Sequence, residues 1–389
     1  MAIAVRHHQA GRLQAAEQIY RQILQAEPNQ PDALHLLGLI AHQVGKHDVA
    51  VEYIERAASL KGNDPALHNN LGGAYYALHR VADAVACYRR AAELKPDFAQ
   101  AHNNLGIALC DQGKLEEAVA ACRRAVQLKP DYAEAHCNLG AALNRQGKTD
   151  EAIACYRRAV QIKPAYAEAH NNLGNALKAQ GKPDEAVACY RRAVELKPDY
   201  AEAHDNLGVA LCGVGKLDEA AACCRRAVEL KPDSAGAHNN LGSTLKDQGK
   251  LDEAIACYRR ALELRPDYAG AHINLGVAFT EQGKLDEAAA CCRRALELKP
   301  DSAEAHGNLG SVLEELGDLR GAEDSFRAAL RHNPRLALAH CRLAELLGGK
   351  LPDDDLGALR RLLDETDLDD AQRLLLHFGL AKVLDARGE

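Results

Sequence analysis

A Leu-Gly pair that recurs every 34 residues is the feature that most limits how this chain can fold. One register covers nine consecutive units, from Pro31 to Leu336. A repeat of this length buries its apolar face only by stacking on its neighbours, so the sequence predicts one elongated core in place of several globular domains. The glycines of the pair are Gly38, Gly72, Gly106, Gly140, Gly174, Gly208, Gly242, Gly276 and Gly310.

Within each unit, numbered here as positions 1 to 34, the residue pattern predicts two antiparallel helices. In the unit from Ala167 to Tyr200, apolar residues at positions 7, 10 and 11, and again at 21, 24, 28 and 30, keep a helical period. Small residues at positions 8, 20 and 27 allow the two backbones to approach closely. Gly181 at position 15 is expected to end the first helix in a left-handed conformation. Asp184 suits the start of the second helix, and proline at position 32 ends it.

These residues resemble the tetratricopeptide-repeat family, whose pattern has a large residue at position 4, Leu-Gly at 7 and 8, Ala at 20 and 27, and Pro at 32. The resemblance implies an all-α fold, a right-handed superhelix (α-solenoid) of antiparallel helical hairpins. Two departures stand out. Position 4, usually a large aromatic residue, is His in nine repeats from His68 to His340, and His79 replaces the expected Gly at position 15.

The two ends of the chain differ from its middle. Residues 1–30 carry a diverged repeat in the same phase, which can act as an N-terminal cap, and residues 31–336 hold the nine full units. Residues 337–389 begin a further repeat that the stretch GGKLPDDD interrupts, and the register places a lone first helix at the end. We therefore expect an unpaired final helix and a natural protein that continues beyond Glu389.

An asparagine at position 6 recurs in eight successive repeats and is the main candidate for function. A carboxamide both donates and accepts hydrogen bonds, so such a ladder can grip the peptide bonds of an extended chain whatever its side chains. The alternative is a structural role in which each amide is satisfied inside its own repeat. Residues at positions 5, 9 and 12, such as Asn171, Asn175 and Lys178, would then set any preference. The ladder consists of Asn70, Asn104, Asn138, Asn172, Asn206, Asn240, Asn274 and Asn308.

The ladder is similar to that of the protein O-linked N-acetylglucosamine transferases, where an Asn at this position lines the concave groove and contacts substrate backbone. Bacterial relatives of these enzymes have such arrays ahead of a glycosyltransferase domain. Family members that bind a C-terminal carboxylate have basic residues around such an Asn. Here position 2 is acidic in Glu134, Glu168 and Glu202, which disfavours a carboxylate clamp and suggests basic or neutral ligands.

The stretch from Leu359 also resembles the segment that precedes a sulfotransferase domain in other bacterial proteins.

Three other recurring residue types have plainer interpretations. The His residues at position 4 lie one repeat apart, roughly 10 Å, whereas a zinc centre needs its nitrogens about 2 Å from one ion; packing at the helix interface is favoured. The thirteen Cys read as reduced, apolar fillers, although Cys137 and Cys341 could present reactive thiols at position 5. The Arg-Arg doublets at positions 25 and 26 are balanced by acids, which indicates ion pairing.

The overall composition excludes several classes of function. The formal charge is -7, with four Phe and no Trp, which argues against a nucleic-acid surface with stacking platforms. No apolar run reaches the roughly 20 residues of a membrane span, and no secretory signal is present, so we expect a cytoplasmic protein. No cofactor-binding loop and no unique set of catalytic residues occurs.

The leading hypothesis is a scaffold for a protein or extended peptide. The alternatives are the substrate-recruiting arm of a glycosyltransferase or sulfotransferase, and self-association through the C-terminal helix.

Overall fold

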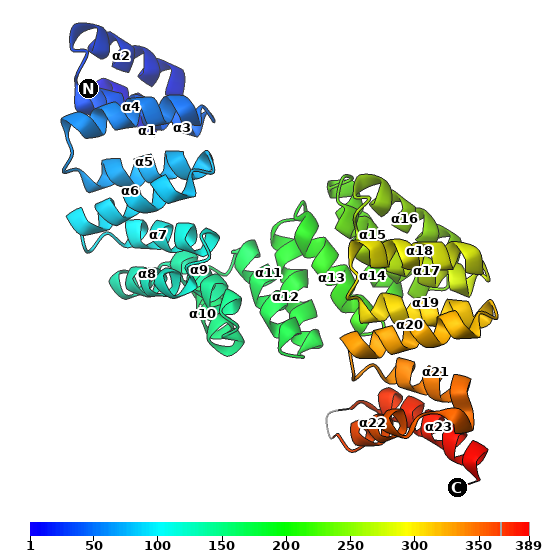
Figure 1. Ribbon diagram of the computed structural model, residues 1–389. Coiled ribbons are helices and arrows are strands. Elements are labelled where there is room, and N and C mark those ends of the chain that lie inside the picture. Colours follow the sequence, from blue (N-terminus) through cyan, green and yellow to red (C-terminus); the bar gives the residue numbers. More distant parts are fainter. Residues whose placement is uncertain (366–367, 389) are drawn as a thin grey trace. The chain divides into compact units, whose positions relative to one another are not determined.

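The computed structural model describes residues 1–365 and 368–388, and every regular element in these ranges is helical. Two compact units, Met1–Pro198 and Asp199–Glu389, make up the chain. Within each unit, hairpins of two helices stack in chain order (Figure 1). The predicted all-α solenoid of antiparallel hairpins is therefore confirmed. Thr366, Asp367 and Glu389, which belong to the predicted C-terminal segment, lie outside the described residues.

The helix bounds follow the 34-residue register. In the first unit the helices are α1 (Ala2–Gln9), α2 (Leu13–Ala26), α3 (Pro31–Gln43), α4 (His47–Leu60), α5 (Pro65–Ala77), α6 (Val81–Leu94), α7 (Ala99–Asp111), α8 (Leu115–Leu128), α9 (Ala133–Arg145), α10 (Thr149–Ile162), α11 (Ala167–Ala179) and α12 (Pro183–Leu196). In the second unit they are α13 (Ala201–Gly213), α14 (Leu217–Leu230), α15 (Ala235–Asp247), α16 (Leu251–Leu264), α17 (Ala269–Glu281), α18 (Leu285–Leu298), α19 (Ala303–Glu315), α20 (Leu319–His332), α21 (Ala337–Leu347), the 3-10 turn η1 (Gly348–Lys350), α22 (Asp353–Leu363) and α23 (Asp370–Arg387).

The turn between the two helices of a repeat depends on a left-handed residue at position 15. Gly181 ends the first helix of its repeat with φ of 77°, as the sequence predicts. His79 occupies the same position with φ of 57°, where a side chain with a Cβ is strained. The second repeat therefore keeps the turn of its neighbours at a conformational cost.

The contact between the two helices of a repeat explains the small residues of the pattern. In the repeat that contains α11 and α12, a Cβ on Gly174 would lie 2.6 Å from Tyr190 Cε1, so the tyrosine ring takes the place of a side chain at position 8. Ala186 and Ala193, at positions 20 and 27, are completely buried. Because the backbones approach this closely, each hairpin forms one thin layer of the core.

The histidines at position 4 bond to the turn between repeats, in line with the packing role that the sequence favoured. Nε2 of His170 lies 3.1 Å from the carbonyl oxygen of Pro164, and Nε2 of His340 lies 2.9 Å from that of Pro334. The same bond to the residue six positions earlier recurs at His68, His102, His136, His238, His272 and His306. Each imidazole thus satisfies a carbonyl in the turn that connects one repeat to the next.

The Arg-Arg doublets form ion pairs, as their balance with acids indicated. The first arginine reaches the next repeat: Arg123 Nη2 lies 2.8 Å from Glu151 Oε2. The second stays on its own helix, with Arg192 Nη1 2.9 Å from Glu195 Oε2. All four side chains are about half exposed, so each pair adds little stability by itself.

The C-terminal region corrects one expectation, because its last helix is not unpaired. Helix α23 packs along α21. A Cβ on Gly379 would come within 3.0 Å of Cys341 Cα, and the same glycine faces Ala344. Gly349, just after α21, lies against Ala386 near the end of α23. The two helices therefore run in the same direction, in close contact that a glycine makes possible.

Burial on α23 gives the physical reason for this packing. Leu376 and Val383 are completely buried, because the interrupted hairpin leaves the side of α21 open for them. Leu374 and Phe378 remain 72% and 48% exposed on the other side of the helix. Self-association through this helix stays a prediction, and it would use the side that carries these two exposed residues.

The strain at His79 predicts that replacing it with glycine stabilises the protein. We expect H79G to raise the free energy of unfolding by about 1 kcal/mol, since glycine adopts a positive φ without steric cost. Urea denaturation followed by circular dichroism measures the change. As the reciprocal control, G113A should lower stability by a similar amount, because Gly113 has φ of 75°. An unchanged midpoint in H79G would show that the turn carries no strain.

The buried histidines predict that stability falls on mild acidification. Burial lowers the pKa of His35, His170 and His340 below the ordinary value of about 6.5. The unfolded chain then binds more protons than the folded chain as pH falls through 6.5, so folding is disfavoured there. We expect a lower urea midpoint at pH 5.5 than at pH 7.5, and a smaller difference in H170N. A midpoint that is constant or higher at pH 5.5 would contradict this.

Candidate peptide-binding face

The eight ladder asparagines lie on the first helices of their repeats, and all are partly exposed. Four lie in each unit: those of the first are on α5, α7, α9 and α11, and those of the second on α13, α15, α17 and α19. We call the ladder face the surface formed by these asparagines and the residues at positions 2, 9, 12 and 13 around them. This placement agrees with the expectation from the sequence that the side chains at position 6 are accessible to a ligand.

Most ladder amides are tied to the preceding repeat, a contact that the sequence interpretation missed. Asn104 Nδ2 donates to Asn69 Oδ1 at 3.1 Å, and Asn138 Nδ2 donates to Asn103 Oδ1 at 2.9 Å. The acceptor always belongs to the residue at position 5 of the repeat before. Further bonds of this kind join Asn70 to His35, Asn172 to Cys137, Asn240 to Asp205 and Asn274 to Asn239.

This bond sets the orientation of each amide and leaves part of it for a ligand. A carboxamide has two N–H groups and a carbonyl oxygen with two lone pairs. The bond to position 5 uses one N–H, so a second N–H and the carbonyl remain on a partly exposed side chain. In two repeats the carbonyl also accepts from its neighbour, since Asn69 Nδ2 lies 3.4 Å from Asn70 Oδ1 and Asn103 Nδ2 lies 3.4 Å from Asn104 Oδ1. The amides that make this bond are therefore held in a fixed orientation at the surface.

A polar residue at position 5 of the preceding repeat is the signal that could have revealed the inter-repeat bond. Position 5 is occupied by an acceptor in His35, Asn69 and Asn239, among others. The last ladder residue, Asn308, follows a repeat whose position 5 is Ile273, which has no acceptor. The ladder thus contains an internal reference position where this bond cannot form.

Of the three residues expected to set ligand preference, one is placed wrongly by the sequence argument. Asn171 is 0% exposed, because position 5 points into the contact between repeats. Asn175 is partly exposed and its Oδ1 accepts from the Tyr190 hydroxyl at 2.7 Å. Lys178 is exposed on the ladder face. Direct contact with a ligand is therefore compatible with Asn175 and Lys178 and not with Asn171.

The acidic residues at position 2 are partly neutralised. Lys163 Nζ lies 2.8 Å from Glu134 Oε1, and Lys197 Nζ lies 3.2 Å from Glu168 Oε1. Hydrogen bonding to Lys163 lowers the pKa of the Glu134 carboxyl. Because each acid has a lysine beside it, the inference that the face prefers basic ligands is weakened.

The two cysteines considered as reactive thiols are shielded. Cys137 and Cys341 are both 3% exposed. Burial raises the pKa of both thiols, which reduces the thiolate fraction at neutral pH. Cys137 Sγ also accepts from Asn172 Nδ2 at 3.6 Å. These thiols therefore act as packing groups within the stack.

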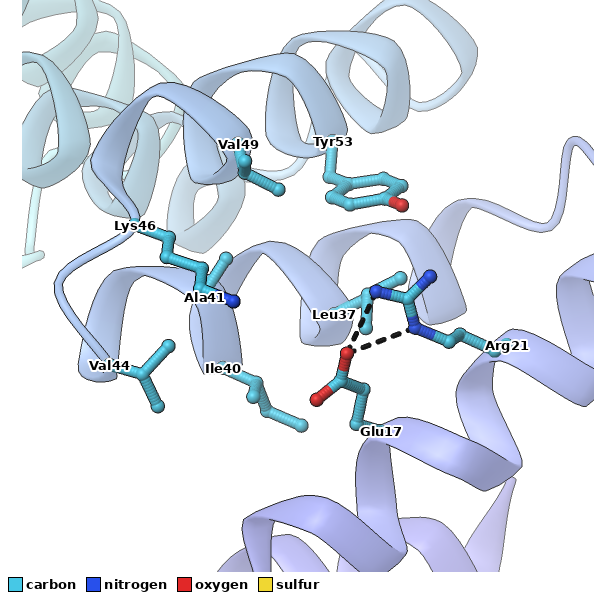
Figure 2. A pocket seen from close by; sticks show the side chains of 9 residues that line it. All are labelled: Glu17, Arg21, Leu37, Ile40, Ala41, Val44, Lys46, Val49 and Tyr53. Carbon is cyan, nitrogen blue, oxygen red and sulfur yellow. Dashed lines mark hydrogen bonds and ion pairs between the residues drawn. The ribbon is translucent and has the colours of Figure 1, made fainter.

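A cavity at the N-terminal end lies apart from the ladder face (Figure 2). Its volume is about 130 Å³. Later repeats pair an arginine at position 25 with a glutamate at position 19 of the next repeat, but Val49 replaces that glutamate here, and Arg21 pairs with Glu17 on its own helix at 2.8 Å. The cavity results from this divergence. Its lining is Glu17, Arg21, Leu37, Ile40, Ala41, Val44, Lys46, Val49 and Tyr53.

Residues 1–365 and 368–388 contain no group of three His, Cys, Asp or Glu side chains that could hold a metal ion. Over the same residues, none of the helices has the length and apolar character needed to cross a bilayer.

Comparison with known families agrees with the repeat geometry. Residues 132–345, more than half of the chain, match the tetratricopeptide-repeat family described as "Cilia and flagella-associated protein 70 C-terminal domain". The chain belongs to this tetratricopeptide-repeat family. Two further tetratricopeptide-repeat families match residues 74–112 and 108–147, and residues 1–66. Among curated proteins, none matches the sequence of this tetratricopeptide-repeat protein.

Solved structures also share local similarity with the chain. YrrB, described as a TPR protein with an unusual peptide-binding site, is 26% identical over 47% of this chain and 95% of its own, with a TM-score of 0.41. MamA is 28% identical over 43% and 97%, with a TM-score of 0.39. PilF of Pseudomonas aeruginosa is 22% identical over 53% and 94%, with a TM-score of 0.48.

The inter-repeat bond predicts that ladder asparagines differ in their contribution to stability. We expect N274A to lower the free energy of unfolding by about 1 kcal/mol, because it leaves the buried Asn239 without its donor. N308A is the matched control one repeat later, where Ile273 provides no acceptor, and its effect should be much smaller. Urea midpoints measure both. Equal losses in the two variants would contradict a stabilising role for the bond.

Proposed function

We propose that this tetratricopeptide-repeat protein is a scaffold that holds an extended polypeptide along its ladder face. The observation that carries the proposal is the row of partly exposed amides whose orientation is set by bonds to the preceding repeat. Tetratricopeptide-repeat proteins generally bind protein partners. An amide that keeps one donor and its acceptor matches the C=O and N–H of a peptide bond.

The spacing of the ladder suits an extended chain. Adjacent first helices in stacked hairpins lie roughly 10 Å apart, and an extended peptide advances about 3.3 Å per residue. Successive asparagines would then meet about every third peptide unit of the ligand. Because the contacts go to backbone, recognition depends weakly on ligand sequence. A carboxylate clamp is a poor alternative, because position 2 carries Glu134 and Glu168 in place of basic residues, and the lysines beside them are already paired with these acids.

A second candidate function uses the same contacts. The resemblance at position 6 to the N-acetylglucosamine transferase relatives favours a substrate-recruiting arm, in which the held polypeptide is the substrate of a glycosyltransferase or sulfotransferase domain. In this proposal the residues of the present chain bind and position the substrate, and no step of the reaction belongs to them. Both candidates therefore predict the same binding behaviour for the present chain.

Replacing three ladder residues of one unit tests the proposal. We expect N104A/N138A/N172A to bind an extended, unstructured peptide at least tenfold more weakly than the native chain, because three pairs of backbone contacts are lost. Fluorescence anisotropy with a labelled peptide of about 20 residues provides the measurement, and circular dichroism verifies the helix content.

The matched control is R90A/R124A/R158A, which changes three exposed side chains on the second helices of the same unit. This variant should retain native affinity. An unchanged affinity in the asparagine variant, with helices intact, would remove the ladder as the binding element.

A further inference from the structure

A cavity of about 190 Å³ opens beside the ladder in the second unit. It lies between α13, α14 and the start of α15. Asp205, in its wall, accepts from the ladder residue Asn240 at 3.0 Å, so the cavity adjoins the ladder directly. Its lining consists of Ala201, Glu202, Asp205, Ala227, Lys231, Ser234 and Ala237.

In the next repeat, an aromatic ring fills the corresponding place. Tyr268 packs against Ala235, Ala261 and Ala271, which occupy the positions held by Ala201, Ala227 and Ala237 around the cavity. The guanidinium of Arg265 lies 4.3 Å from the centroid of the Tyr268 ring. Lys231 of the cavity stands at the same position as Arg265. The cavity thus has the walls and the overlying cation of a tyrosine site without its tyrosine.

The sequence explains why this repeat has a cavity where its neighbour has a ring. Position 34 is aromatic in Tyr132, Tyr166 and Tyr268 but is Ser234 here. Ser302 is a second serine at this position, but in its repeat Ile273 at position 5 packs against the buried Ala295 and Ala305. In the repeat of Ser234, position 5 is Asp205, a short polar side chain.

The acid at position 5 favours a ring that carries a hydroxyl group. In the first unit, Tyr166 at position 34 lies close enough to Cys137 at position 5 for the thiol to contribute, after burial, to the raised pKa of the Tyr166 hydroxyl. Asp205 puts a carboxylate at that same position, and a carboxylate is a stronger acceptor for a phenol than a thiol is. The alanines around the ring provide an apolar wall.

We propose that this cavity receives a tyrosine side chain of the bound polypeptide, which takes the place of the missing aromatic residue at position 34. The ring packs on Ala201, Ala227 and Ala237 beneath Lys231, and its hydroxyl donates to Asp205. This inference rests on the proposed function, since it adds a preference for one side chain to a ladder that otherwise contacts only the ligand backbone. It assigns specificity to one repeat of the second unit.

Peptides that differ at one residue test the preference. The probes are labelled 20-residue peptides of Gly, Ser, Thr and Asn with a single central Tyr, Phe, Lys or Ala. We expect the Tyr peptide to bind about tenfold more tightly than the Ala peptide, with Phe between them. Equal affinities for Tyr and Ala would overturn the proposal. Tightest binding of the Lys peptide would also overturn it and identify an acidic subsite.

Two variants of Ser234 locate the preference. S234Y restores the aromatic residue of the neighbouring repeats and should abolish the advantage of the Tyr peptide, whereas S234A leaves the cavity open and should retain it. Thermal denaturation checks that S234Y is folded, as expected for a residue that the same position tolerates in Tyr268. A preference that survives in S234Y would show that the tyrosine binds elsewhere.

A small probe separates failure of this inference from failure of the proposed function. N-acetyl-tyrosinamide is too short to bridge two ladder residues, so its binding reports the cavity alone. Its aromatic proton signals should broaden with the native chain, S234A and N274A, and should stay sharp with S234Y. Loss of peptide binding in ladder variants together with sharp probe signals throughout would support the ladder and reject the tyrosine cavity.

Discussion

The close approach of two helices at position 8 is the contact on which the rest of this structure depends. Where the second helix carries tyrosine, its ring lies directly on a glycine of the first, as Tyr190 does on Gly174. Completely buried alanines at positions 20 and 27 keep the same two backbones close. A layer this thin buries little by itself, so each hairpin relies on the next one along the chain. The 34-residue register follows from this need for each hairpin to pack against the next.

Stacking of these layers also creates the ladder face. Because every first helix follows the previous one in the same register, position 6 of each repeat lies beside position 5 of the repeat before it, within reach of a hydrogen bond. The same amide therefore contributes to cohesion between repeats and to the exposed ladder. The structural role and the proposed binding role, which the sequence analysis treated as alternatives, are compatible in one side chain because a carboxamide has more hydrogen-bonding groups than either role requires.

Sequence patterns predicted the repeats, the helices and their turns, since each depends on residues within one 34-residue unit. Gly181 and the histidines at position 4 belong to this group. The patterns failed where a residue's environment depends on its neighbours in space. Asn171 and Asn172 differ by one position, yet the first is completely buried and the second partly exposed. The packing of α23 against α21 was missed for the same reason, because no register connects helices across the interruption after Gly348.

The inter-repeat amide bonds give the ladder a direction. In each of them, the donor is the asparagine and the acceptor belongs to the repeat before it. The remaining N–H and carbonyl of successive asparagines are consequently arranged in the same sense within a unit. A peptide backbone is itself polar, and its reversal would exchange donors for acceptors at every contact. A polypeptide held in the proposed way would therefore be selected for its N-to-C orientation, even where its side chains are not recognised.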